Sequence, residues 1–340
     1  MVDSTLTGSE AAQIPLGTQM YGYLPIGTLP VDMRVEVSKT IPGQFLEVSE
    51  QSSKLRPIYN RYMFYPPVTT PEGKQSQGMD SFHQVLFETS YMMNRFIFAW
   101  DPKELAEPGI ELGGDDSARK WTIENAQLGS DTVMLLFAAS GKKGLSFAHE
   151  LKHNRLTSTK PGLVVAVGSD SSRAFVEGTG LFDKILKYDA DSTSDATTEL
   201  GLKPTSKIVV CDFGARDSAA TRWVENLKPN YDNIVYLGVG EVAPDSPDMI
   251  VEKFKVRASS PMIQVNASGL RTQAMTIIGE KRYFEEFLKE WKAFKAGGGF
   301  KGLHLVWDEG MEAGITWEKI CKGEFMPDEG SVFTLPSLQG

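Results

Sequence analysis

The stretch that most constrains the fold of this chain runs from Thr132 to Asp189. It holds three short apolar runs separated by two segments of helical character. The first run, Thr132 to Ala138, is too short for a core helix and ends at a turn of small residues, so it predicts a buried parallel strand. The order strand, helix, strand, helix, strand is that of a mononucleotide-binding half of a doubly wound sheet. A helix that opens directly after such a strand points N–H groups outward at its start, which favours an anion.

The turn after the first predicted strand has two of the three glycines of a dinucleotide-binding loop. The three positions fall on Ala139, Gly141 and Gly144. In that fingerprint the glycines allow the tight turn, the approach of a pyrophosphate to the backbone, and the packing of helix on strand. Two glycines at this spacing also occur in α/β proteins that bind no nucleotide, so the spacing alone does not decide the function.

The second predicted strand, Leu163 to Val167, ends in a polar run that strengthens the interpretation. The run is GSDSSR over residues 168–173, where the residue that contacts a ribose is expected. An acidic side chain there favours NAD, whereas hydroxyls and a guanidinium suit the 2′-phosphate of NADP. Both kinds are present, and the residues alone leave the choice open.

These segments resemble a known superfamily. Three motifs resemble the nucleotide-binding domain of the medium-chain dehydrogenase/reductase superfamily, in its zinc-free quinone and enoyl reductase branch. They are the loop AASG with Gly144 after it, VGS with Arg173 four residues on, and GLFDKILKY over 180–188. Three further runs look like an uncharacterised bacterial and fungal family within that superfamily: RAFVEG at 173–178, YGYLP at 21–25 and YNRY at 59–62. The match covers the chain from about Gly17 to the C-terminus.

The resemblance implies an α/β fold, with a Rossmann-type doubly wound parallel sheet beside a smaller β-rich barrel of the GroES-like kind. The chain is expected to begin well inside that barrel. This predicts an incomplete barrel, a barrel completed by a neighbouring subunit, or a more open site, and it makes a homodimer a candidate assembly. The expected boundaries are a flexible lead over 1–16, a partial β-rich substrate domain with its connecting helix over 17–125, a Rossmann domain over 126–260, and a C-terminal segment over 261–340 that returns to the substrate domain.

The resemblance also assigns roles by position, and it implies NADPH as the cofactor. Ser169 and Arg173 would hold the 2′-phosphate, and Tyr188 would lie by the adenosine, while Asp170 argues against this assignment. In an open α/β sheet the ligand sits beyond the carboxyl ends of the strands, which adds residues that follow later strands. The candidate cofactor-binding residues are Ser140, Gly141, Lys142, Gly144, Ser169, Arg173, Tyr188, Phe213, Gly214, Gly238 and Thr89.

The loop departs from the superfamily pattern at two positions. Lys142 and Lys143 stand where a small residue and a valine are usual. The two lysines would either strengthen phosphate binding or crowd the close approach that small residues permit.

Candidates for proton transfer lie in the first third of the chain. The tyrosine-rich segment 55–67 contains Tyr62, and tyrosines in such a setting are more often half-buried core residues. Residues 68–78 predict a mobile loop by composition. The segment Phe82 to Trp100 has apolar residues at helical spacing, which a core helix explains.

Within that helical segment the resemblance places Thr89 and Ser90 beside a nicotinamide carboxamide or a substrate carbonyl. The alternative is back-bonding of both hydroxyls within the helix. The candidate catalytic residues are Tyr62, Tyr91 and Ser90.

Later segments complete the expected sheet. Strands are predicted at Lys207 to Asp212 and Asn233 to Leu237, with a helix at Ser218 to Leu227 between them. Glu280 to Ala296 predicts an amphipathic helix whose aromatic stripe is core or interface.

Composition excludes some classes of function. The formal net charge of −9 argues against a nucleic-acid surface, because phosphates would be repelled. No apolar run reaches the roughly 20 residues of a membrane span, and the N-terminus is not signal-like, so a cytoplasmic protein is expected. Cys211 and Cys321 are two isolated cysteines, which offer neither a disulfide framework nor a zinc quartet.

The chemistry implied is hydride transfer without a metal, to an enoyl, quinone or carbonyl group of a small hydrophobic metabolite, in secondary metabolism. An alternative is a redox-neutral isomerase, cyclase or dehydratase that acts on a polyketide- or terpene-like intermediate. A third interpretation is a non-catalytic binding protein. Retention of the cofactor separates the first from the third, and consumption of NADPH separates the first from the second.

Overall fold

A computed structural model describes residues 19–23, 34–50, 57–65, 68, 70–109, 121–192, 194–239, 262–309, 318, 319, 322 and 324–334. The predicted lead over 1–16 and Cys321 lie outside these residues. The chain divides into two compact units. The first comprises 1–84, 278–297 and 303–340, and the second comprises 85–277 and 298–302. Among the described residues, no helix is long and apolar enough to cross a membrane.

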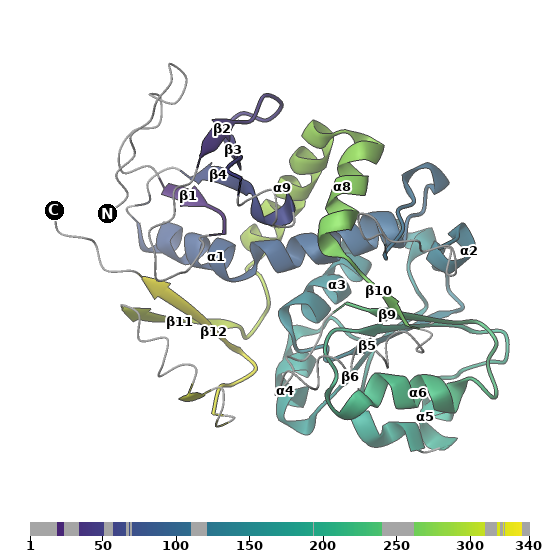
Figure 1. The fold of residues 1–340 in the computed structure, drawn as a ribbon. Helices are drawn as coiled ribbons and strands as arrows, with labels where there is room; N and C mark the ends of the chain where they lie inside the picture. The colour runs from purple at the N-terminus through teal and green to yellow at the C-terminus, as the bar shows by residue number, and fades with distance from the viewer. Residues whose placement is uncertain are drawn as a thin grey trace. The chain divides into compact units, whose positions relative to one another are not determined.

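The second unit is built on a six-stranded parallel sheet (Figure 1). Its strand order is β10-β9-β8-β5-β6-β7, so the order reverses between β5 and β8. This is the Rossmann order, and the predicted fold class of a Rossmann-type sheet with a smaller β-rich unit is confirmed. The strands are β5 (Thr132–Phe137), β6 (Leu163–Gly168), β7 (Lys184–Lys187), β8 (Lys207–Asp212), β9 (Ile234–Gly238) and β10 (Ile263–Gln264).

Strand β5 is the central strand, and all six of its residues are buried. A strand covered on both faces needs a continuous apolar run, which TVMLLF supplies. Alternate residues such as Leu135 and Phe137 belong to the core between one face of the sheet and helices α5 and α6. Helix α3 lies on the opposite face of the sheet (Figure 1). The helices of this unit are α2 (Ile123–Ala126), α3 (Lys142–His153), α4 (Asp170–Thr179), α5 (Ser194–Glu199), α6 (Ala219–Leu227) and α8 (Ala267–Ile278).

The first unit contains a four-stranded antiparallel sheet of order β1-β4-β3-β2. A separate pair of parallel strands, β11 and β12, belongs to the same unit. Helix α9 buries the aromatic stripe that the sequence predicts, with Phe284, Phe287 and Trp291 about 1% exposed. The elements are β1 (Gln19–Tyr21), β2 (Val35–Val37), β3 (Gln44–Glu47), β4 (Arg61–Tyr65), α9 (Glu280–Ala296), β11 (His304–Glu309) and β12 (Glu329–Thr334).

Helix α1 (Pro71–Met92) begins earlier than composition suggests, and the predicted loop over 68–78 is wrong from residue 71 on. Proline suits the first helical position, because its fixed φ is pre-organised and its missing N–H would have no partner inside the helix. Thr70 Oγ1 caps the helix by accepting the Gly73 N–H at 3.1 Å, and Glu72 stands in the first turn. The cap and the acidic residue in the first turn stabilise a helix start whose composition is typical of a loop.

Candidate functional site

Backbone strain in the second unit is concentrated where the strand order reverses. The non-glycine residues with positive φ in the described parts of the chain are Ala138 (53°), Asp217 (53°) and Ser218 (52°). Ala138 directly follows β5, and the other two lie in the loop between β8 and α6. Such conformations cost about 1–3 kcal/mol each and cluster at ligand sites. Ligands of open α/β sheets bind outside the carboxyl ends of the strands at this reversal point.

The loop after β5 leads directly into α3. Gly141 is the N-cap residue and contributes no side-chain cap. Its N–H donates to Ala138 O at 3.0 Å, and Leu145 N–H returns to Gly141 O at 3.0 Å. The first N–H groups of a helix have no partner inside the helix, and the helix dipole favours a negative charge there. The start of α3 therefore suits an anion, although a helix start alone does not identify one.

Gly144 is required by packing. A Cβ at this position would lie 2.9 Å from both Cα and O of Ala139, closer than real Cβ atoms come to backbone. At Gly141 the nearest atom would be Ala138 O at 3.3 Å, a tight but lesser contact. Gly144 thus lets the helix approach the strand end as the sequence predicts, and Ala139 itself is buried.

The two lysines at the start of α3 are partly buried. Burial lowers the pKa of both Lys142 and Lys143 from the ordinary value. Lys143 Nζ donates to Val239 O at 3.0 Å, directly after β9. Because β8 lies between β5 and β9, this bond links the helix after β5 to the residue after a strand two places away in the sheet. Sequence reasoning identified the substitution but could not locate this contact.

The polar run after β6 forms a cluster of hydroxyls at the start of α4. Ser169 Oγ lies 2.9 Å from Ser171 Oγ and 3.4 Å from Ser172 Oγ. The two predicted charges there have partners on the protein surface. Arg173 Nε donates to Glu177 at 2.9 Å, and Lys187 Nζ donates to Asp170 at 2.7 Å. Asp170 is therefore partly neutralised by a lysine at the end of β7.

Tyr188 follows β7 and lies against the core below the site. Its ring stacks on Phe137 at 6.4 Å between centroids, and its carbonyl accepts the Trp223 indole N–H at 2.9 Å. Burial, and then the charge of Asp212, raise the pKa of the Tyr188 hydroxyl. The phenol thus stays protonated and can act as a hydrogen-bond donor.

Asp212 shapes the loop after β8. Its Oδ1 accepts the N–H groups of Gly214 at 2.9 Å and Ala215 at 2.7 Å. Burial raises the pKa of this carboxyl, and those two bonds oppose the rise. Gly214 has φ 117°, which favours glycine, and Phe213 packs its ring against Phe147 at 6.1 Å. Sequence reasoning named Phe213 and Gly214 but not Asp212, the side chain that holds them.

Gly238 ends β9 beside two side chains of the neighbouring segment. A Cβ there would lie 2.6 Å from Met262 Sδ and 2.9 Å from Gln264 Oε1. The glycine therefore allows close packing of these side chains against the strand end.

The hydroxyls at the end of α1 bond to the backbone. Thr89 Oγ1 donates to Val85 O at 3.3 Å, which is the back-bonding alternative. Ser90 Oγ lies 3.4 Å from Leu86 O and also donates to Lys143 O at 2.9 Å, so it reaches the first turn of α3. Tyr91 is fully buried, with its ring edge-on to Phe96.

Tyr62 belongs to the first unit and has a structural environment there. Tyr62 is 6% exposed, its ring fills the space over Gly22, and its hydroxyl donates to Tyr23 O. Burial, with the charge of Glu47, raises the pKa of this phenol.

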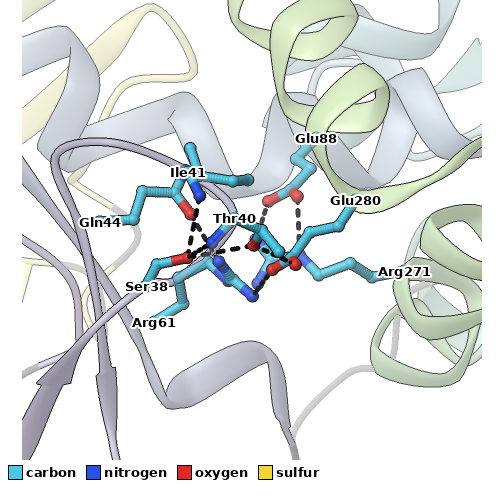
Figure 2. Close-up of polar contacts among 8 residues, drawn as sticks. All are labelled: Ser38, Thr40, Ile41, Gln44, Arg61, Glu88, Arg271 and Glu280. Atoms are coloured by element: carbon cyan, nitrogen blue, oxygen red, sulfur yellow. Dashed lines mark hydrogen bonds and ion pairs between the residues drawn. The ribbon is translucent and has the colours of Figure 1, made fainter.

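Two ion-pair systems that sequence reasoning missed are drawn in Figure 2. In the first unit Arg61 pairs with Glu280, which also accepts from Thr40, and the Arg61 guanidinium lies 4.7 Å from the Phe284 ring centre. In the second unit Arg271 pairs with Glu88 of α1 (Figure 2). No group of three His, Cys, Asp or Glu side chains is placed to hold a metal within the described ranges.

The sequence matches a family model over residues 4–326, described as a protein of unknown function (DUF2855). The chain belongs to this family. Sequence comparison finds no match among curated proteins.

Solved structures of similar architecture include three enzymes. The CurF ER cyclopropanase from the curacin A biosynthetic pathway is 12% identical, with TM-score 0.45 over 88% of this chain and 74% of that one. The JamJ enoyl reductase in its apo form is 11% identical, with TM-score 0.47 over 86% and 72%. A mutant enoyl thioester reductase from Candida tropicalis is 10% identical, with TM-score 0.45 over 88% and 75%.

Proposed function

We propose that this protein is a zinc-free, NADP(H)-dependent reductase of an enoyl, quinone or carbonyl group in a small hydrophobic metabolite. The observation that carries the proposal is the loop from Ala138 to Gly144. It combines a strained turn, a helix start without a side-chain cap and a glycine in contact with backbone, all at the reversal point of a Rossmann sheet. These are the features that a pyrophosphate needs.

The residues present fit a dinucleotide. The N–H groups of the first turn of α3 would bind the pyrophosphate, and Lys142 adds positive charge beside them. Ser169 and Arg173 would bind the 2′-phosphate, and Tyr188 would line the adenosine side. When bound, the dinucleotide would supply the hydride.

The protein's own part in the reaction would be to orient the substrate, exclude water and provide a proton. Tyr62, Tyr91 and Ser90 remain the proposed groups for that proton. Ser90 donates a hydrogen bond to Lys143 O in the first turn of α3. The Thr89 hydroxyl would give up its bond to Val85 O and bond the carboxamide instead. The free-energy cost of this exchange would be small, because the bond to Val85 O is long.

A redox-neutral isomerase, cyclase or dehydratase is the second candidate. The observation that favours it is Lys143, whose ammonium is fixed beyond the carboxyl end of β9 by its bond to Val239 O. An ammonium at the carboxyl ends of the strands could polarise a substrate carbonyl without any change of oxidation state.

Calorimetric titration with NADPH and NADH tests the proposal. The protein should bind NADPH more tightly, and Arg173→Ala should weaken NADPH binding more than NADH binding. Arg282→Ala is the matched control, because Arg282 in α9 bonds Glu286 through Nε with the same spacing of four residues.

Two results would count against the proposal. An equal loss for both nucleotides in Arg173→Ala would remove Arg173 from the 2′-phosphate site. A wild-type protein that binds neither nucleotide at millimolar concentration would favour the redox-neutral candidate.

A further inference from the structure

The position of Lys143 has a consequence for the two halves of the proposed dinucleotide site. The pyrophosphate would sit at the start of α3, which follows β5, and the adenosine side would extend toward Ser169 at the end of β6. Strand β6 lies on one side of β5, and β8 and β9 lie on the other. The nicotinamide half would therefore extend over the ends of β8 and β9.

The Lys143 side chain extends from α3 toward β9, on the side of the sheet where the nicotinamide half would lie. It starts in the first turn of α3 and reaches Val239 O, 3.0 Å away, directly after β9. The backbone carbonyl that it bonds is itself fixed, because Val239 N–H donates to Asp212 O at 2.7 Å. The Lys143 carbonyl is likewise held by Ser90 Oγ at 2.9 Å. Lys143 is thus anchored both at its backbone carbonyl and at its ammonium.

We propose that Lys143 makes this site distinguish the two oxidation states of the nicotinamide, so that it binds the reduced dinucleotide in preference to the oxidised one. The inference rests on the proposed function. The oxidised ring carries a positive charge and the reduced ring is neutral, whereas both forms share the same phosphates and adenosine. A fixed cation in the nicotinamide half repels only the oxidised form. In a partly buried site such a repulsion corresponds to a difference on the order of tenfold in affinity.

The preference suits a reductase. Like-charge repulsion would speed release of the oxidised dinucleotide after hydride transfer, and it would reduce inhibition by that product. Lys142 does not share this role, because we propose that it adds charge beside the pyrophosphate, and both oxidation states carry the same phosphates.

Binding of NADPH and of NADP⁺ to four proteins tests the inference without any substrate. Wild type should bind NADPH about tenfold or more tightly than NADP⁺ near pH 7. Lys143→Met should bring the two dissociation constants close together, mainly through tighter binding of NADP⁺. Lys143→Arg keeps a charge throughout the neutral range and should keep the preference. Lys142→Met should weaken both forms alike and leave their ratio unchanged.

Thermal unfolding of each variant identifies any that do not fold, and Lys143→Arg allows the charge to be tested even if Lys143→Met does not fold. Wild type that binds both forms equally, or a Lys143→Met protein that keeps the wild-type ratio, would overturn the inference and leave the proposed function intact. Failure of wild type to bind either form would overturn both.

Discussion

Arg271 of α8 holds Glu88 of α1 in a buried, two-point ion pair. Arg271 Nε lies 2.7 Å from Glu88 Oε1, and the second guanidinium nitrogen contacts Oε2. The side chains are 9% and 3% exposed. The planar guanidinium forms two parallel hydrogen bonds to the carboxylate. The pair therefore sets how the two helices approach each other, and the two buried charges compensate each other.

Removing one partner of this pair should be strongly destabilising. Glu88→Ala would leave a buried guanidinium without its counter-charge, at a cost of about 3–5 kcal/mol. Urea unfolding followed by circular dichroism measures the loss. Glu286→Ala removes a carboxylate from the exposed pair with Arg282 and should cost under about 1 kcal/mol. Similar losses in the two variants would contradict the buried pair.

Gly144→Ala should destabilise the α3 loop, because the added Cβ would meet Ala139 backbone at 2.9 Å. Overpacking of this kind costs about 1–3 kcal/mol. Gly178 in α4 is the matched helical glycine, with no atom within 4 Å of an added Cβ, so Gly178→Ala should stabilise by about 0.5–1 kcal/mol. Thermal unfolding compares them, and a stabilised Gly144→Ala protein would refute the close approach.

His149 should make the protein less stable as the pH falls. Burial, with the charge of His153, lowers the pKa of His149 from 6.5 to about 4. Between these values the unfolded chain holds a proton that the folded chain does not, so unfolding becomes easier as pH drops from 6.5 to 4, by up to about 3 kcal/mol.

The measurement is the free energy of unfolding across that pH range. His149→Phe removes the titrating group, so the curve should be flatter than that of wild type. His153→Gln removes the smaller cause of the His149 shift together with an imidazole whose own pKa is lowered by burial, and it should flatten the curve less. Parallel curves for wild type and His149→Phe would show that the group does not titrate in this window.

Asp80 of the first unit should be energetically coupled to Lys295. The carboxylate accepts from Lys295 Nζ at 2.6 Å and from the Trp291 indole N–H at 2.7 Å. Asp80→Asn should cost about 1.5–3 kcal/mol, since it removes the charge opposite a mostly buried ammonium. The double variant Asp80→Asn with Lys295→Met should lose less than the sum of the single losses. Additive losses in the unfolding cycle would show that the two side chains act independently.

The sequence predicted well the elements whose pattern is local. Strands β5, β6 and β8 are short apolar runs bounded by small or polar residues, and α9 carries its aromatic residues at helical spacing. The βαβ order then determines a parallel sheet, because parallel strands need a crossover. The start of α1 was missed, since Pro71, Gly73 and Gly78 read as loop residues while the cap from Thr70 outweighs them.

The candidate site could be predicted only in part. The positions of Gly141, Gly144 and Ser169 follow from spacing after a strand. The contact from Lys143 to Val239 joins residues 96 positions apart, and the pair of Glu88 and Arg271 joins residues 183 apart. One sequence contains no signal for such pairings. The left-handed backbone at Asp217 and Ser218 was equally hidden, because neither residue type requires it.

The indole of Trp223 contacts Tyr188, one of the residues of the proposed site. It is 2% exposed, its N–H is bonded to the carbonyl of Tyr188, and its ring lies edge-on to Phe137 at the end of β5. A ligand that moves Tyr188 would change the polarity around this fluorophore and therefore its emission. The chain has six tryptophans, so replacing the other five by phenylalanine would leave Trp223 as an intrinsic fluorescence reporter of changes at Tyr188.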